Sequence, residues 1–155
     1  PTDAFARERV LDASKCIAYL TIENRGPVPE ILRPGVGDRV FGCDICQEVC
    51  PWNRFEKHGR FLPEPREPLV VPLEELAGLD AAAFKRRFRN LPVSRAKRRG
   101  LIRNVLLAMG NSGLPRFRAI LEVCSSDPDE MLAEQARWSL ARLPASGPEH
   151  MSGEE

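Results

Sequence analysis

The sequence predicts an α+β to mostly α protein made of two parts, a cysteine-rich N-terminal module and a C-terminal domain of short helices. Two observations lead to this fold class. Residues 1–62 hold four of the five cysteines among many prolines and glycines, whereas residues 73–144 repeat apolar side chains at helical spacing. We expect a proline-rich linker over residues 63–72 and a disordered, acidic tail over residues 145–155.

The cysteines of the N-terminal module are spaced like iron ligands. Cys43, Cys46 and Cys50 form the pattern C-x2-C-x3-C, and Pro51 follows directly. This is the second half of the bacterial ferredoxin pattern, in which the last cysteine binds the other of two clusters. The two-residue gap lets two thiolates reach different irons of one cubane. The three-residue gap starts a helical turn, with Pro51 in its first turn, and points the last thiol away.

The motif therefore predicts a ferredoxin-like [4Fe–4S] half-module. A zinc site is the main alternative, although zinc sites usually combine two C-x2-C pairs or cysteines with histidines. The remaining alternative is a set of free thiols that bind no metal. Ligand-like cysteine spacing at a net charge of +1 also argues against a secreted disulfide scaffold, so we expect the cytoplasm. No apolar run approaches the roughly 20 residues of a membrane span, and we expect no membrane contact.

Each predicted helix is placed by a capping residue, a breaker or an apolar stripe. In the N-terminal module we expect a helix over residues 12–20, with Asp12 or Ser14 as its N-cap, and one turn over residues 29–32. The following domain should hold five helices, over residues 73–79, 80–90 capped by Asp80, 94–109 capped by Ser94 and stopped by Gly110, 114–123, and from Asp127 onward. A weak 34-residue repeat relates residues 103–113 to residues 137–147 and suggests HEAT-like helix pairs.

The charges of the helical domain are distributed unevenly. Residues 81–121 hold eleven lysines or arginines and no aspartate or glutamate. Ion pairs within a helix cannot neutralise such a block. We therefore predict contact with nucleic acid, driven by counterion release, with a merely solvated helical surface as the alternative. The predicted contact residues lie around a helix start, where backbone N–H groups can also bind an anion: Arg95, Lys97, Arg98, Arg99 and Arg103.

Several motifs follow one another in a characteristic order: DASKCIAYLTIE at 12–23, GPVPE at 26–30, GCDICQEVCPWN at 42–53, RGLIRN at 99–104 and MGN at 109–111. This order resembles the C-terminal part of the epoxyqueuosine reductases, which carry out the last step of tRNA queuosine synthesis. The resemblance extends to about residue 143. The chain also begins Pro1-Thr2 without a methionine, like residues that follow a cluster cysteine, so we expect a C-terminal fragment with a cysteine just before Pro1.

The resemblance implies an enzyme that uses cobalamin and two [4Fe–4S] clusters to reduce the epoxide of epoxyqueuosine at the wobble base of tRNA. Cys16, Cys43 and Cys46 would share one cluster with the cysteine before Pro1, and Cys50 would bind the other. The cobalamin domain and the proton-donating acid would lie upstream. The resemblance thus implies no catalytic residue in this chain, and no activity of the chain by itself.

The resemblance also implies the remaining contacts. Ser14, Asp44 and Ile45 would approach the cobalamin, the helical domain would hold the tRNA anticodon arm, and the protein would act as a monomer with an unidentified electron donor. We expect Trp52 to pack over the cluster rather than to stack on a base, and Cys124 and Trp138 to lie in the core. The alternative function is a ferredoxin-type electron carrier whose helical domain binds an acidic protein.

Overall fold

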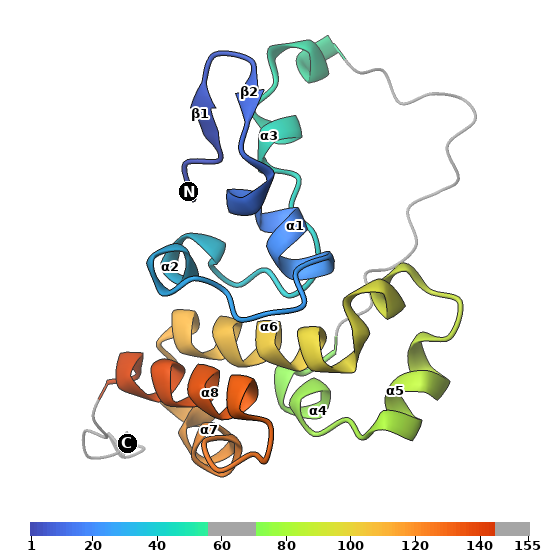
Figure 1. The fold of residues 1–155 in the computed structure, drawn as a ribbon, viewed down its shortest axis with the longest axis vertical. Coiled ribbons are helices and arrows are strands. Elements are labelled where there is room, and N and C mark those ends of the chain that lie inside the picture. Colours follow the sequence, from blue (N-terminus) through green and yellow to red (C-terminus); the bar gives the residue numbers. More distant parts are fainter. Residues whose placement is uncertain (56–70, 145–155) are drawn as a thin grey trace, which may run out of the picture.

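The computed structural model describes residues 1–55 and 71–144 (Figure 1). The expected linker, except for residues 71 and 72, and the expected tail lie outside the described residues. The described part is mostly helical with one small two-stranded sheet, so the coarse fold class is confirmed. In Figure 1 the N-terminal module lies on one side of the long helix α6, and the other helices of the C-terminal domain lie on the opposite side. None of the described helices is long and apolar enough to cross a membrane.

The N-terminal module begins with a hairpin that the sequence did not predict. Strands β1 (Phe5–Arg7) and β2 (Val10–Leu11) pair antiparallel, and both are too short to show a clear alternation of apolar residues. The helix expected over residues 12–20 is wrong in one respect, because it is divided in two. A 3₁₀ turn over Ala13–Lys15 is followed by α1 (Ile17–Ile22), and between them Cys16 has an extended backbone with φ −67° and ψ 124°.

Three further short helical segments follow in this module. The turn expected over residues 29–32 is present as a 3₁₀ helix over Glu30–Leu32, but it continues directly into α2 (Arg33–Val36). Pro34 does not end the helix, because it occupies the first turn, where no N–H donor is needed. Helix α3 (Ile45–Glu48) lies within the cysteine motif, and a 3₁₀ helix over Pro51–Phe55 closes it.

The C-terminal domain contains five α-helices: α4 (Leu73–Ala77), α5 (Ala81–Phe88), α6 (Lys97–Ser112), α7 (Arg118–Cys124) and α8 (Glu130–Arg142). Asp80 caps α5 as expected, accepting a hydrogen bond from the N–H of Ala83 at 2.6 Å. Two predicted caps are wrong. Ser94 belongs to a 3₁₀ helix over Pro92–Ala96, so α6 starts only at Lys97. Asp129, not Asp127, caps α8 through the N–H of Met131.

Helix α6 is buried on all sides along its centre. Every residue from 100 to 110 is buried. The sequence predicted one buried apolar face, but the helix is covered by other parts of the protein on all faces. Helices α1 and α2 contact it from the N-terminal module, while α4 and α8 contact it from the C-terminal domain. Its main cluster includes Val105, Leu106 and Met109 of α6 together with Leu121 of α7.

Gly110 does not stop α6 as predicted. The helix continues to Ser112 and ends at Gly113, whose φ of +65° is the left-handed conformation that favours glycine. A Cβ atom added at Gly110 would lie 2.6 Å from the Cβ of Ser139, so the glycine permits α6 and α8 to cross closely. The two helices run in the same direction, because Arg99 and Asp129 meet near their starts and Gly110 and Ser139 meet nearer their ends.

Candidate iron–sulfur site

Three of the four predicted cluster ligands line one pocket of about 300 Å³. Cys16 enters it from the junction before α1, and Cys43 and Cys46 enter it from the segment around α3. The rest of the wall comes from the N-terminal segment, the hairpin and the two helices, and it is mostly apolar: Pro1, Thr2, Asp3, Ala4, Phe5, Leu11, Ile17, Ile45 and Val49.

The first residues of the chain are held tightly at this pocket. The hydroxyl of Thr2 donates to the carbonyl of Lys15 at 2.6 Å, directly before Cys16. On the other side, a Cβ atom at Gly35 would lie 2.4 Å from the carbonyl oxygen of Pro1, so only glycine allows this approach. The chain start and Cys16 are thereby brought to the same wall.

Local turns place the other cysteines. Gly42 has a φ of +81° and donates its N–H to the hydroxyl of Thr21 at 3.0 Å, which fixes the chain just before Cys43. The carbonyl of Asp44 accepts from the N–H groups of Gln47 and Glu48 at 2.8 and 2.9 Å and starts the turn that carries Cys46. Cys50, one turn later, does not line this pocket.

The donors suit a cluster better than a single metal ion. Thiolates are the ligands of iron–sulfur clusters and of zinc alike. In the described part of the chain, however, no three or more histidine, cysteine or acidic side chains are gathered closely enough to hold one ion. Three thiols spread around an apolar pocket, with Cys50 outside it, instead fit a larger inorganic core shared among several segments.

The predicted cobalamin contacts differ in their placement. Ile45 lines the same pocket as the cysteines. Ser14 and Asp44 are exposed, and each is engaged locally: the Ser14 hydroxyl donates to Asp12 Oδ1 at 2.6 Å, and Asp44 Oδ1 accepts from Gln47 at 3.1 Å. Trp52 is 83% exposed and does not line this pocket, so it does not cover the site that Cys16, Cys43 and Cys46 share.

The predicted nucleic-acid contacts include one residue that cannot reach RNA. Arg103 is 0% exposed, and its guanidinium donates to the carbonyls of Leu20 and Asn24 at 2.6 and 3.0 Å and also to that of Gly26. Burial, together with nearby arginines, lowers the pKa of Arg103 to about 10, so it stays charged at neutral pH. The prediction for Arg103 is therefore wrong. The sequence signal that could have shown this is the run of apolar residues on both sides of it.

The other four predicted contacts lie at the surface or close to it, and two of them already have acidic partners. Arg95 pairs with Glu23, and Arg99 forms a two-point contact with Asp129, in which one N–O distance is 2.8 Å. Arg98 is half-buried and donates to the carbonyl of Leu79 at 2.6 Å. Lys97 is exposed. These two acids, Glu23 and Asp129, lie outside residues 81–121. The ion pairs could therefore not be predicted from the sequence of the basic block.

The two residues assigned to the core are both half-buried. Cys124 packs against the main cluster, and burial, with a smaller effect of Asp127, raises the pKa of its thiol. Trp138 contacts two cations, with its ring centroid 5.4 Å from the guanidinium carbon of Arg33 and 4.9 Å from that of Arg142.

Comparison with known families first defines the class. Residues 1–53 match the 4Fe-4S double cluster binding domain, so this module is of a type that binds iron–sulfur clusters. Curated relatives then name the enzyme that the chain resembles. The chain is 39% identical to the epoxyqueuosine reductase of Xanthomonas campestris pv. campestris, with 92% of this chain and 41% of the relative covered. It is 42% identical to that of Pseudomonas aeruginosa, with 92% and 40% covered.

Solved structures agree with this relationship. A crystal structure of epoxyqueuosine reductase with a tRNA-Tyr epoxyqueuosine-modified stem loop matches with a TM-score of 0.79 at 29% identity, covering 92% of this chain and 38% of that one. The enzyme from Bacillus subtilis matches with a TM-score of 0.63 at 25% identity, covering 93% and 48%. The predicted resemblance is confirmed. The chain spans about 40–41% of the length of these two curated relatives.

Proposed function

We propose that this chain is part of an epoxyqueuosine reductase, which reduces epoxyqueuosine to queuosine at the wobble position of tRNA. The observation that carries the proposal is the pocket shared by Cys16, Cys43 and Cys46, in a chain related to these enzymes over 92% of its length. In this assignment the chain contributes cluster ligands and an RNA-binding surface. The enzyme is a monomer of the cytoplasm and receives electrons from a donor still to be identified.

We assign Cys16, Cys43 and Cys46 to one [4Fe–4S] cluster. Pro1 itself lies in the wall of the same pocket. Cys50, which lies outside this pocket, is assigned to a second cluster. Cobalamin is assigned to the edge formed by Ser14, Asp44 and Ile45. When bound, these groups supply electron transfer and the reduction of the epoxide.

The chain's own residues create the environment for that chemistry. Ile17, Ile45 and Val49 line the pocket with apolar side chains, and an apolar lining of this kind tunes the potential of a bound cluster. The junction at Cys16 keeps an extended backbone between two helical segments, so its thiol can face the pocket. None of the helical-domain residues is assigned a proton, a nucleophile or a metal ligand.

We assign the tRNA anticodon arm to the exposed basic residues of the helical domain. Lys85, Arg86 and Arg89 are exposed at the end of α5, and Lys97 is exposed at the start of α6. Within residues 1–55 and 71–144 these four side chains form no ion pair, in contrast to Arg95 and Arg99. A cation that is not already paired with an acid can neutralise a phosphate, and the counterions released from the nucleic acid then favour binding. The parallel packing of α6 and α8 supports the HEAT-like arrangement proposed for this domain.

The test uses the protein encoded by the complete gene, reconstituted with iron and sulfide without oxygen. We expect close to eight irons per protein and single-turnover reduction of epoxyqueuosine-containing tRNA after addition of cobalamin and a chemical reductant. Stoichiometric zinc without iron would refute the cluster assignment. Bound clusters without tRNA binding, together with binding of an acidic protein, would instead support a ferredoxin-type electron carrier with a protein-interaction domain.

A further inference from the structure

Two adjacent polar residues of α6 are completely buried. Arg103 and Asn104 are both 0% exposed, in the middle of the most enclosed helix of the protein. Arg103 donates to Asn104 Oδ1 from Nε and Nη2, at 3.1 and 2.8 Å, so the two side chains form one unit. Burying a charge and an amide is costly unless each finds partners. Their partners therefore indicate what the unit is for.

Those other partners are backbone carbonyls of the N-terminal module. Arg103 donates to three carbonyls from the last turn of α1 to Gly26. Asn104 Nδ2 donates to the carbonyls of Thr21 and Val40, both at 2.8 Å. Thr21 lies in α1, five residues after Cys16, and Val40 lies three residues before Cys43. One amide thus holds both cysteine-bearing segments, which are far apart in the sequence. Helix α1 contacts α6, and Figure 1 shows both helices of this contact.

Thr21 extends this link to the cysteines themselves. Its hydroxyl donates to the carbonyl of Ile17 at 2.8 Å, next to Cys16, and accepts from the N–H of Gly42 at 3.0 Å, next to Cys43. Thr21 is itself buried. The residues adjacent to two predicted ligands are therefore bridged by one hydroxyl, which α6 fixes through Asn104.

We propose that Asn104 and Thr21, supported by Arg103, are positioning residues that set the separation of Cys16 and Cys43 for a cluster. This inference rests on the proposed function insofar as it requires that a cluster is bound. It adds a role to the helical domain: besides carrying RNA contacts, α6 forms the rigid base on which the ligand-bearing segments are fixed.

The chain offers a matched control for Asn104. Asn111 lies two turns further along the same helix, and its Nδ2 also donates to two backbone carbonyls, those of Arg33 and Gly37, at 2.8 and 2.9 Å. These carbonyls belong to α2 and the residue that ends it, which carry no cysteine. Asn104→Ala and Asn111→Ala therefore remove the same kind of contact between the same two parts of the protein, but only the first touches the cysteine-bearing segments.

The experiment measures, without oxygen, the rate at which reconstituted full-length protein loses iron to an excess of chelator, together with the electron paramagnetic resonance spectrum of the reduced clusters. We expect Thr21→Val and Asn104→Ala to release part of their iron about tenfold faster or more, the size typical when the hydrogen bonds that orient metal ligands are removed. Their spectra should also change. Thr21→Ser, which keeps the hydroxyl, should restore both properties, and Asn111→Ala should resemble the unchanged protein.

The outcomes separate this inference from the proposed function. Equal iron release and equal spectra for Thr21→Val, Thr21→Ser and Asn111→Ala would overturn the positioning role while leaving cluster binding intact. If Asn104→Ala does not fold, the pair of Thr21 variants decides, because valine and threonine have nearly the same shape. Failure of the unchanged protein to bind any iron would refute the cluster itself, and with it this role.

Discussion

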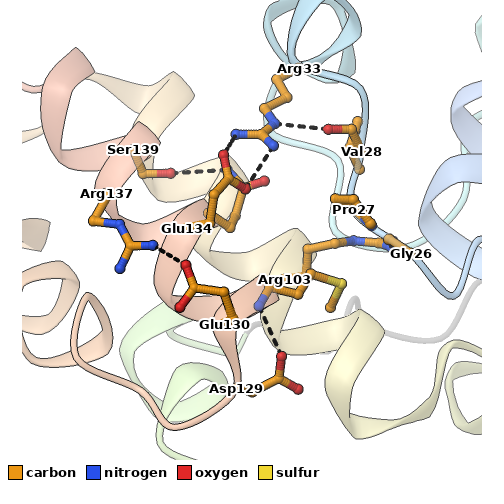
Figure 2. Close-up of polar contacts among 12 residues, drawn as sticks. Gly26, Pro27, Val28, Arg33, Arg103, Asp129, Glu130, Glu134, Arg137 and Ser139 are labelled. Atoms are coloured by element: carbon orange, nitrogen blue, oxygen red, sulfur yellow. Dashed lines mark hydrogen bonds and ion pairs between the residues drawn. The ribbon is translucent and has the colours of Figure 1, made fainter.

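Arg33 of α2 donates to both carboxylate oxygens of Glu134 of α8, each at 2.9 Å, across 101 residues of sequence (Figure 2). Arg33 is only 3% exposed, and its Nε also donates to the carbonyl of Val28 at 2.9 Å. This contact joins the cysteine-bearing module directly to the helical domain. A two-point contact between a planar guanidinium and a carboxylate is geometrically specific, so it also fixes the orientation of the two parts.

Glu134→Gln should destabilise the protein by about 2–3 kcal/mol, because it leaves the buried charge of Arg33 without its counter-ion. Glu130→Gln on the same helix is the control. Glu130 pairs with Arg137 (Figure 2) but is 82% exposed, and such surface pairs contribute below about 1 kcal/mol. Urea unfolding of both variants measures the difference, and equal midpoints would contradict the importance of the Arg33 contact.

Gly110→Ala should also destabilise the protein, by about 1–3 kcal/mol, because the added methyl group overlaps Ser139 and forces α6 and α8 apart. Gly100→Ala on the same helix is a matched control, since a Cβ atom there has no neighbour within 4 Å. Alanine is the better helix former, so that variant should be unchanged or more stable by up to about 1 kcal/mol. Thermal unfolding followed by circular dichroism gives both values, and a stable Gly110→Ala would refute the close crossing.

Features that depend on neighbouring residues in the sequence could be predicted. Asp80 caps its helix, and Phe84 and Phe88, one turn apart, lie with their ring centroids 5.2 Å from each other. The spacing of Cys43 and Cys46 predicted a shared site, and both line one pocket, whereas Cys16, which lines it too, was assigned only through the family resemblance. In each case the deciding contacts lie within one or two turns of the chain or follow from the geometry of a short motif.

Features that depend on distant partners could not be predicted. The basic block looked free of acids, but Glu23 and Asp129, which lie 72 and 30 residues from their arginines, supply them. Arg103 looked like a surface cation because the carbonyls that bury it belong to the other module. The start of α8 was placed at Asp127, whose carboxylate in fact accepts from the N–H of Asp129 at 2.8 Å and turns the chain just before the true cap.

The contact between Arg99 and Asp129 should make stability depend on pH in the acid range. The hydrogen bond from Arg99 is the largest cause that lowers the pKa of Asp129 below its ordinary 3.8. The stabilisation is therefore complete above pH 3.8 and is lost as the pH falls through the lowered folded pKa. Because both groups are partly exposed, we expect less than about 1 kcal/mol. Asp129→Asn keeps a good N-cap, so unfolding measured from pH 7 to 3 should show a flatter acid dependence for this variant.

Removal of Lys85 and Arg86 of α5, which form no ion pair with any of the residues that the structure describes, should weaken RNA binding in a salt-dependent way. We expect Lys85→Ala combined with Arg86→Ala to lower the slope of log affinity against log salt by about 0.7–0.9 for each phosphate that is no longer neutralised. The control is Arg137→Ala combined with Arg142→Ala on α8, which removes the same charge from another helix. Filter binding of a tRNA anticodon stem loop at several salt concentrations compares them. Equal slopes in the two double variants would mean that only net charge matters and that α5 forms no RNA contact.

The cysteines should separate into cluster ligands and one packing residue. Cys16→Ser should remove iron from the reconstituted protein and abolish reduction of epoxyqueuosine, because Cys16 enters the pocket from a different segment than Cys43 and Cys46 and serine is a poor substitute for a thiolate. Cys124→Ser should keep its iron and its turnover per folded protein, and lose about 1 kcal/mol of stability for a half-buried hydroxyl without a good partner.

Since burial raises the pKa of Cys124, it should also react more slowly with iodoacetamide at neutral pH than the exposed Cys46 in protein without iron. Iron content and single turnover of both variants, with alkylation of the unchanged protein, check these outcomes, and loss of iron from Cys124→Ser with retention in Cys16→Ser would reverse the assignment.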